Sequence, residues 1–370
     1  MNGKMKAIIF HGVGDVRLDE MDIPQIGPKD VLLKSVLTSV CGSDMHPYRV
    51  GARMASIPNE IGGHEYIATV AEVGEEVTKY KVGDRVFGHN LAFCGTCWYC
   101  QHGDYGHCIN SVKSYTGRGR PGGFAQYFKF DYPEDPNAFA PYLNSLIKIP
   151  DDVSDIDVCL AEPFGVGLGA VEVCDIKEGQ TVVVLGSGII ANSAMQWAKA
   201  RGAKVILVGR SKRRLDCALE CGADHVIDNT NGDCYEQIAA LTGEPHYNWG
   251  KHACAVDVVL DCAGYPGSFN DAIKIARCGG TVCCVAYYES ESMVNPMLIT
   301  VKDMKVLGMN LCDFMGALEG IKAGTVKTMP LIDDIVPLER YMEAYQRQND
   351  GSAMKVLIDM TSKPQGRFHE

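Results

Sequence analysis

Four cysteines lie within a single fifteen-residue stretch, with the spacing C-x2-C-x2-C-x7-C: Cys94, Cys97, Cys100 and Cys108. Four thiolates at such spacing suit one tetrahedral Zn²⁺ ion. A closed four-sulfur shell leaves no position for substrate, so the site is expected to be structural. The alternatives are a disulfide pair or separate buried thiols, which suit a secreted chain or an ordinary core better. The stretch predicts a zinc-bound lobe at residues 94–108 and directs attention to a second, open metal site elsewhere.

The composition and net charge of the chain exclude some classes of binding partner. The chain has 370 residues, enough for two domains, and 46% of them are hydrophobic. A net charge of −11 argues against nucleic acid or an anionic membrane as a partner. No apolar stretch is long enough for a membrane span or a signal peptide. Sixteen cysteines without an export signal predict reduced thiols and a cytoplasmic protein.

The predicted secondary-structure pattern of the chain changes near Thr181. Before it, short apolar segments such as 6–10, 31–40 and 66–73 alternate with turn residues, which indicates a mostly-β domain. After it, short apolar strands alternate with amphipathic helices as far as Val306, and this pattern predicts an α/β doubly wound parallel sheet. The alternation then ends, so the tail is expected to rejoin the first domain.

A glycine-rich turn follows the first strand of this second region. Its sequence is G-x-G-x-x-A, with Gly186 and Gly188 as the glycines and Ala191 as the small residue that keeps the helix close to the sheet. Because the helix amino terminus offers free N–H groups to phosphates, the turn predicts a dinucleotide site that includes Ile189 and Ile190. A purely structural glycine turn is the alternative.

The end of the next strand bears on which dinucleotide binds. NAD-selective sites carry a carboxylate there, but this chain continues from Val208 with Gly209, Arg210, Ser211 and, further on, Arg214. A glycine leaves room for a 2′-phosphate, which arginine and serine side chains can bind. Cations at a helix amino terminus also oppose the helix dipole, and a bound phosphate would relieve that mismatch. The pattern favours NADP, with NAD as the alternative cofactor.

Three separated segments supply candidate ligands for an open metal site. A thiolate, an imidazole and one or two carboxylates suit Zn²⁺ while leaving a position for a substrate oxygen. Each residue alone has an ordinary explanation as a core thiol, a buried histidine or a helix-start carboxylate. The candidates are Cys41, with Ser43 and His46 beyond it, then His64 and Glu65, and lastly Glu162.

Taken in order, these motifs resemble those of the zinc-containing medium-chain dehydrogenase/reductase family, which includes alcohol, polyol and threonine dehydrogenases. The segments around Cys41 and His64, the four-cysteine lobe and the later glycine turn follow the family's order, and Gly83-Asp84-Arg85-Val86 matches as well. The resemblance implies a GroES-like, mostly-β catalytic domain, residues 1–160 and 303–370, around a Rossmann domain, residues 161–302. It also implies a catalytic zinc held by Cys41, His64 and either Glu65 or Glu162.

The resemblance also implies a reaction. Zinc would polarise the alcohol oxygen while hydride moves between the carbinol carbon and the nicotinamide. Ser43 would pass the alcohol proton towards His46, and Asp44 would orient its neighbours. The ends of two strands should lie beside the nicotinamide, at Cys262, Ala263, Val285 and Ala286.

The substrate is expected to be a small-molecule secondary alcohol or its ketone, with a bulky, apolar one favoured. Polyol dehydrogenases of this branch carry an Arg-Tyr pair where this chain has Leu311 and Cys312, and an apolar pair cannot satisfy several hydroxyls. Insertions at 131–144 and 244–252 are interpreted as a pocket roof or as oligomer contacts. The alternatives are an NAD-dependent polyol or threonine-type dehydrogenase and a non-catalytic nucleotide-binding scaffold. Related enzymes suggest a homodimer or homotetramer.

Overall fold

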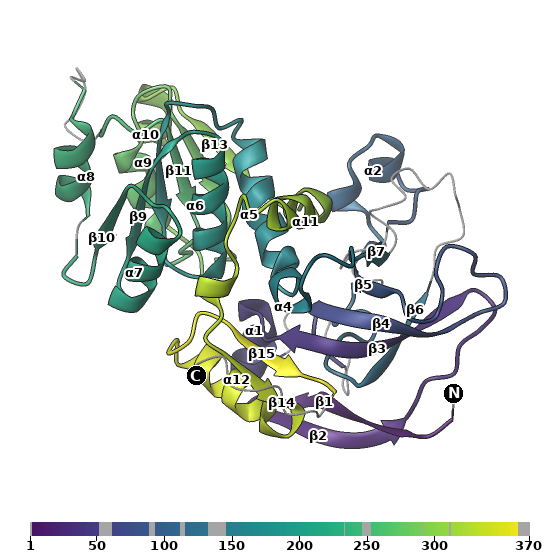
Figure 1. The fold of residues 1–370 in the computed structure, drawn as a ribbon. Coiled ribbons are helices and arrows are strands. Elements are labelled where there is room, and N and C mark those ends of the chain that lie inside the picture. Colours follow the sequence, from purple (N-terminus) through teal and green to yellow (C-terminus); the bar gives the residue numbers. More distant parts are fainter. Residues whose placement is uncertain are drawn as a thin grey trace. The chain divides into compact units, whose positions relative to one another are not determined.

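The computed structural model describes residues 2–51, 61–88, 93–111, 115–131, 146–232, 234–245, 253–288, 290–310 and 312–361. The insertions at 131–144 and 244–252 lie largely outside these residues, as does Leu311. The chain forms two compact units, one of Met1–Leu160 with Ile332–Glu370 and one of Ala161–Leu331 (Figure 1). The first unit therefore contains both ends of the chain.

The first unit is built mainly on antiparallel strands, with one parallel pair, β14 and β15. A hairpin of β1 and β2 accompanies a larger sheet in the order β14-β15-β3-β4-β5-β7, and β6 also pairs with β3. Residues 6–10, 31–40 and 66–73, predicted to be extended, fall in β1, β3 and β4. The strands are β1 (Lys4–Gly12), β2 (Asp15–Asp22), β3 (Asp30–Ser39), β4 (Glu65–Val73), β5 (Arg85–Gly88), β6 (Tyr127–Asp131), β7 (Leu146–Lys148), β14 (Asp334–Pro337) and β15 (Val356–Asp359).

The larger sheet has apolar side chains on both faces. Along β3, Leu32 belongs to one core cluster, while Val31 and Leu33 belong to another, as expected for side chains that alternate across a strand. The first cluster also contains residues of β1 and β15. Short helices complete the unit: α1 (Gly42–Val50), α2 (Trp98–Gln101), α4 (Asp155–Val158), α12 (Tyr341–Asn349) and 3₁₀ turns at Tyr105–His107 and Leu338–Arg340.

The second unit confirms the predicted doubly wound sheet. Its strands are all parallel, in the order β10-β9-β8-β11-β12-β13. The strands are β8 (Thr181–Leu185), β9 (Lys204–Gly209), β10 (His225–Asp228), β11 (Val258–Asp261), β12 (Thr281–Cys284) and β13 (Lys305–Gly308). The helices are α5 (Ala161–Val173), α6 (Ile189–Ala200), α7 (Lys212–Glu220), α8 (Tyr235–Thr242), α9 (Ser268–Ile275), α10 (Pro296–Val301) and α11 (Phe314–Lys322), with a 3₁₀ turn at Met329–Leu331.

Helices cover both faces of the parallel sheet. Alternate strand residues such as Val183 and Ile206 pack with Ile238 of α8 and Ala272 of α9, and α6 and α7 lie against the opposite face (Figure 1). Strands buried on both faces read as continuous apolar runs, which is why Thr181–Leu185 could be identified from its sequence.

The predicted second domain boundary, at residue 303, is wrong. Strand β13 pairs with β12 in the parallel sheet, and α11 packs against α5 with Phe314 and Leu318 buried. Residues 303–331 therefore belong to the second unit, and the chain re-enters the first unit at Ile332. The strand was missed because its exposed edge position gives it no continuous apolar run.

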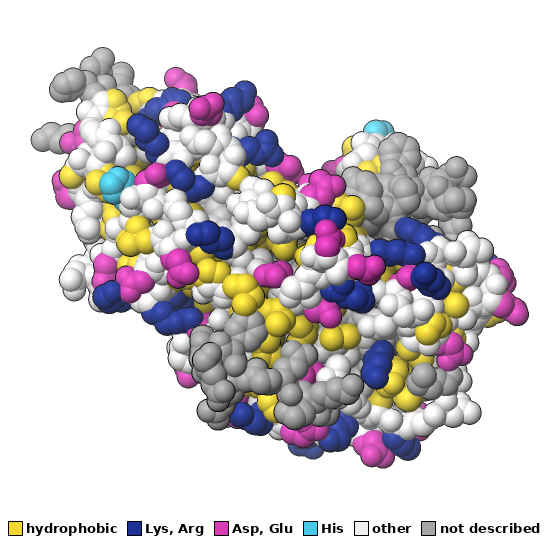
Figure 2. Space-filling view, viewed as in Figure 1, with side chains coloured by type: hydrophobic (Ala, Val, Ile, Leu, Met, Phe, Trp, Pro, Cys, Tyr) yellow, Lys and Arg dark blue, Asp and Glu magenta, His cyan; other side chains and the backbone are white. Residues whose placement is uncertain are grey.

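The surface carries mixed charge. On the face drawn in Figure 2, Lys and Arg side chains are interspersed with Asp and Glu, without one broad basic patch. Across the described helices, none combines the length and the apolar character that crossing a bilayer would require.

The contact between α5 and α6 connects the start of the second unit to its glycine-rich turn. The carbonyl of Phe164 accepts hydrogen bonds from Trp197 Nε1 at 2.9 Å and Ser193 Oγ at 3.3 Å. Gly167 lies where the two helices approach most closely, because a Cβ there would fall 2.6 Å from the backbone nitrogen of Ala194.

Gly167→Ala is expected to lower the free energy of unfolding by about 1–3 kcal/mol, because overpacking must separate the two helices. Urea denaturation followed by circular dichroism measures this. Gly308→Ala is the matched control, since a Cβ at Gly308 meets nothing within 4 Å. Equal stability of the two variants would contradict the tight helix contact.

Candidate active site

A thiol, an imidazole and a carboxylate meet in the first unit. The ligand atoms of Cys41, His64 and Glu65 all lie within 4.8 Å of one another. Cys41 immediately precedes α1, and His64 and Glu65 stand at the start of β4. Both His64 and Glu65 are almost fully buried, with 2% and 1% of their surface exposed. The structure therefore brings together three of the predicted ligands from two separated segments.

The carboxylate of Glu65 is held on one side only. Its Oε2 accepts hydrogen bonds from Lys355 Nζ, at 2.5 Å, and from the hydroxyl of Ser39. Its Oε1 has no hydrogen-bond partner among the described residues. A buried carboxylate oxygen without a partner is costly, so this atom is oriented for a ligand that the protein itself does not supply.

Asp44 connects the other two members of the cluster. Its Oδ2 accepts the backbone N–H of Cys41 at 2.9 Å, and its Oδ1 lies 3.4 Å from Nδ1 of His64. Burial acts against charge on both groups, but their attraction outweighs it: the pKa of Asp44 is lowered and the pKa of His64 is raised well above its usual value. The Asp44 carboxylate and the Cys41 thiol thus favour positive charge at the imidazole.

These observations test whether zinc fits the site. Thiolate, imidazole and carboxylate are ligands that Zn²⁺ accepts, and three protein ligands leave a position for a substrate oxygen. The unpartnered Oε1 of Glu65 suits a divalent cation. Asp44 beside Nδ1 of His64 is the arrangement that fixes a metal-binding imidazole. The residues fit the ion.

The remaining predicted site residues divide between the two units. Ser43 and His46 are three residues apart on α1 and so share a face of the helix. Ser43 Oγ lies 3.4 Å from Nε2 of His64. Glu162 lies in the second unit, in the first turn of α5. Burial raises the pKa of the Cys312 thiol, and the Glu162 carboxylate raises it further, which places Cys312 close to Glu162.

The four-cysteine lobe is also assembled. Cys94, Cys97, Cys100 and Cys108 form the second cluster of potential metal ligands, and each is a free thiol. The sulfurs of Cys94 and Cys100 are 4.0 Å apart, about twice the length of a disulfide bond. Backbone N–H groups of Cys94 and Cys97 donate to sulfurs of the lobe at 3.3 Å. Four sulfurs around a common centre fit a closed zinc site.

The glycine-rich turn has the geometry that a dinucleotide requires. Gly186 adopts a φ of +106°, which is strained for other residues, and Gly188 stands at the amino terminus of α6. A Cβ at Gly188 would meet no protein atom within 4 Å, so the helix start is open to a pyrophosphate. Ile189 and Ile190 form the first turn of α6.

The segment after β9 places cationic side chains around the amino terminus of α7, which has no side-chain capping hydrogen bond. Ser211 precedes α7 without a side-chain capping hydrogen bond, and the guanidinium of Arg210 lies 5.8 Å from the ring centre of Tyr265. Burial, together with the neighbouring Arg213, lowers the pKa of Arg214, a like-charge cost that an anion would relieve. Packing also explains the glycine at position 209, because a Cβ there would approach Ser187.

Asp261 joins the two strand ends that were predicted to face the nicotinamide. Its backbone carbonyl accepts hydrogen bonds from Val285 and Ala286, both at 3.0 Å. Its side chain accepts the N–H of Ala263, the residue after Cys262, and the hydroxyl of Tyr288. Asp261 begins one of the two strand-end segments expected beside the nicotinamide, and the structure buries it fully.

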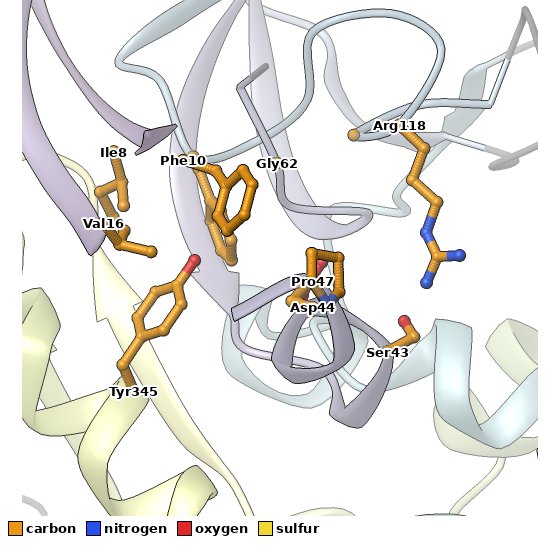
Figure 3. Close-up of a pocket in the computed structure, with 11 residues that line it drawn as sticks. Ile8, Phe10, Val16, Ser43, Asp44, Pro47, Gly62, Arg118 and Tyr345 are labelled. Atoms are coloured by element: carbon orange, nitrogen blue, oxygen red, sulfur yellow. The ribbon is translucent and has the colours of Figure 1, made fainter. Parts of the chain in front are cut away.

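Sequence analysis also missed four residues around the metal cluster: Ser39, Tyr115, Arg118 and Lys355. The ring of Tyr115 meets the ring of His64 edge-on, at 5.9 Å between centroids, and Arg118 lies beside Tyr115. Arg118 and Ser43 line the same cavity of about 50 Å³ (Figure 3). Lys355 had a signal in the sequence, a lysine at the start of an otherwise apolar strand, and it is 1% exposed. The other three offered none, because only the fold brings them to the cluster.

Lys355→Met is expected to lower the free energy of unfolding by about 3–5 kcal/mol, because it leaves the buried Glu65 carboxylate without its cation. Urea denaturation measures this, with Lys34→Met on the exposed side of β3 as the matched control. Adding Glu65→Gln removes the uncompensated charge and should restore part of the loss. A single variant no less stable than the control would show that the ion pair is not formed.

Comparisons with known proteins agree with this geometry. Residues 27–135 match the model of the alcohol dehydrogenase GroES-like domain, and residues 190–322 match that of zinc-binding dehydrogenases. The sorbitol dehydrogenase of Bacillus subtilis (strain 168) is 30% identical over 96% of this chain and 97% of the relative. The L-threonine 3-dehydrogenase of Rhizobium etli (strain CIAT 652) is 26% identical over 97% of this chain and 99% of the relative.

A solved structure extends the likeness to three dimensions. It is described as a zinc-binding dehydrogenase from Sinorhizobium meliloti 1021 bound to NADP, and it matches with a TM-score of 0.82 and 27% identity. The match covers 96% of this chain and 99% of that one. With its metal ligands, glycine-rich turn and near full-length relatives, the chain belongs to the zinc-containing medium-chain dehydrogenase/reductase family.

Proposed function

We propose that this protein transfers hydride between NADP(H) and a secondary alcohol or its ketone, with zinc at the Cys41–His64–Glu65 cluster. The observation that carries the proposal is the free Oε1 of Glu65, buried beside a thiol and an imidazole within 4.8 Å. Such an arrangement has little use in a scaffold protein, because each of its groups costs free energy when it is buried without a ligand. Glu162 is proposed as a further carboxylate ligand.

When bound, zinc supplies Lewis-acid polarisation of the alcohol oxygen, and the nicotinamide supplies the hydride acceptor. The protein's own residues handle the proton. Ser43, whose hydroxyl lies 3.4 Å from the metal-binding imidazole, accepts the alcohol proton and passes it to His46 on the same face of α1. Asp44 acts as a positioning residue, since it holds both the Cys41 backbone and the His64 ring.

NADP is favoured over NAD by the segment after β9. It lacks the carboxylate that binds the ribose hydroxyls of NAD, and it presents Arg210, Ser211 and Arg214 around an uncapped helix start. The aromatic face of Tyr265 supports the Arg210 guanidinium without occupying its N–H edge. The Sinorhizobium meliloti structure, bound to NADP, is consistent with this choice. The NAD-dependent polyol or threonine type stays the alternative.

The setting of the enzyme is proposed to be the cytoplasm, since all sixteen cysteines are free thiols. A homodimer or homotetramer, suggested by related enzymes, stays a prediction.

Metal analysis by mass spectrometry is expected to find two zinc ions per chain. Cys41→Ala and His64→Ala should each remove one ion and abolish turnover while the fold is kept. Cys100→Ser should also remove one ion but should mainly lower stability, because a structural ligand contributes folding free energy. Cys278→Ser, outside both clusters, is the control. A stable but inactive Cys100→Ser would reverse the assignment of the two sites.

Arg210→Ala is expected to weaken NADPH binding roughly 10- to 100-fold and to leave NADH binding nearly unchanged, because only NADPH carries the 2′-phosphate. Fluorescence titration of each reduced cofactor measures both constants. Arg201→Ala, an exposed arginine after α6, is the control. Unchanged NADPH affinity in Arg210→Ala would defeat the 2′-phosphate assignment.

A further inference from the structure

Tyr265 lies in a closely fixed turn that follows β11. Its backbone carbonyl accepts hydrogen bonds from the N–H of Ser268 at 2.9 Å and from the hydroxyl of Ser268 at 2.8 Å. A Cβ at Gly267 would fall 3.2 Å from the ring of Tyr265, so the turn also packs beside the ring. The phenol hydroxyl donates to Oδ2 of Asp271, in the first turn of α9, at 2.5 Å. The ring of Tyr265 is therefore held at its backbone, beside Gly267 and at its hydroxyl.

This turn lies next to the glycine-rich turn. In the parallel sheet, β9 and β11 flank β8 on its two sides. A Cβ at Gly186 would lie 3.1 Å from backbone atoms of Cys262, so the chain that leaves β11 packs against the turn that leaves β8. Arg210 follows β9 and Tyr265 follows β11, so their contact spans the end of β8. Dinucleotides bind at this carboxyl edge of such sheets.

The ring of Tyr265 is suited to attract the cation of Arg210. The guanidinium carbon lies over the ring, 5.8 Å from its centre, which is within the range of a cation–π contact. Burial raises the pKa of Tyr265 and the hydrogen bond to Asp271 raises it further, so the hydroxyl remains the donor of that bond near neutral pH. Because donation to a carboxylate adds electron density to the ring, the bond also strengthens the attraction of the ring for a cation.

Arg210 needs such support because its side chain is long and exposed. Immobilising a flexible side chain when a ligand binds costs about 0.5–1.5 kcal/mol. A contact that restricts the guanidinium before the ligand arrives removes part of this cost from the binding step. The fixed ring of Tyr265 makes such a contact, so it should strengthen the binding of any group that Arg210 holds.

We propose that Tyr265 is a positioning residue for Arg210 and thereby sets the preference for a ribose 2′-phosphate, with Asp271 fixing the ring. The inference rests on the proposed NADP-dependent function and names a further residue that controls its choice of cofactor. Selection then depends on the residue after β11 as well as on the segment after β9. Tyr265 acts through Arg210 and does not itself bind the phosphate.

The test measures the binding of adenosine 2′,5′-bisphosphate and of 5′-AMP by calorimetry, because only the first carries a 2′-phosphate and neither requires zinc or turnover. Tyr265→Leu should weaken binding of the bisphosphate roughly 3- to 10-fold and should change binding of 5′-AMP less than about twofold. Tyr265→Phe keeps the ring and should retain most of the preference. Tyr127→Leu is the matched control, since it removes a comparable contact with Lys34, at 5.9 Å, in the first unit.

The double variant of Tyr265→Leu and Arg210→Ala tests whether the tyrosine acts through the arginine. It should bind the bisphosphate as weakly as Arg210→Ala alone. Losses that multiply in the double variant, or a Tyr265→Leu loss that is equal for both nucleotides, would refute the positioning role and leave the NADP assignment standing. The same holds if Arg210→Ala loses the preference and Tyr265→Leu keeps it.

Two further outcomes separate this inference from the proposed function. If the unaltered protein binds both nucleotides equally, the NADP assignment and the positioning role are both overturned. If the variants bind as expected but the zinc-loaded protein oxidises no alcohol, the positioning role stands and the dehydrogenase function falls.

Discussion

The ion pair between Glu65 and Lys355 links the amino-terminal and carboxyl-terminal segments that together form the first unit. Lys355 lies immediately before β15, which pairs with β3, and its ammonium group reaches Glu65 at the start of β4 and the carbonyl of Val40. Both side chains are almost completely excluded from water. A buried pair of this kind is a poor source of stability, because desolvation of two charges offsets their attraction. Its value is in orientation: with Oε2 held, the second oxygen can point only towards Cys41 and His64.

This constraint explains why the catalytic unit is closed by the carboxyl-terminal segment of the chain. Without β15 and Lys355, Glu65 would be a buried carboxylate with Ser39 as its main partner, and a buried charge without its counter-ion is costly. The same sheet that forms the core thus also supplies the counter-ion of the Glu65 carboxylate. Asp44 does the equivalent for the opposite side of the cluster, where one carboxylate holds both a ligand's backbone and another ligand's ring.

A feature could be predicted from the sequence when all of its residues lie within one short segment. The cysteine lobe and the glycine-rich turn are contained in short segments whose spacing is itself the signal, and the structure assembles the first and gives the second the expected backbone. Cys41, His64 and Glu65 needed the resemblance to a family, because nothing in their spacing shows that they meet. The lysine next to an apolar strand marks Lys355, but Glu65 stands 290 residues away, so the sequence does not show that the two meet. Arg118 lies on a turn packed on Gly63, and no periodicity or motif indicates that position. Strand β13 was missed for a different reason, since its exposed edge lacks the apolar run of its neighbours.

The two proposed metal sites also depend on the fold in opposite ways. The lobe around Cys94 has a minimal apolar core, in which Phe93 and the cysteines themselves are the main buried members, so the ion must supply what packing does not. The cluster around Glu65 lies between well-packed strands, and there the protein organises the ligands before the ion arrives. A site fixed in advance can keep a coordination position open for substrate, because its geometry does not rely on the metal saturating every ligand.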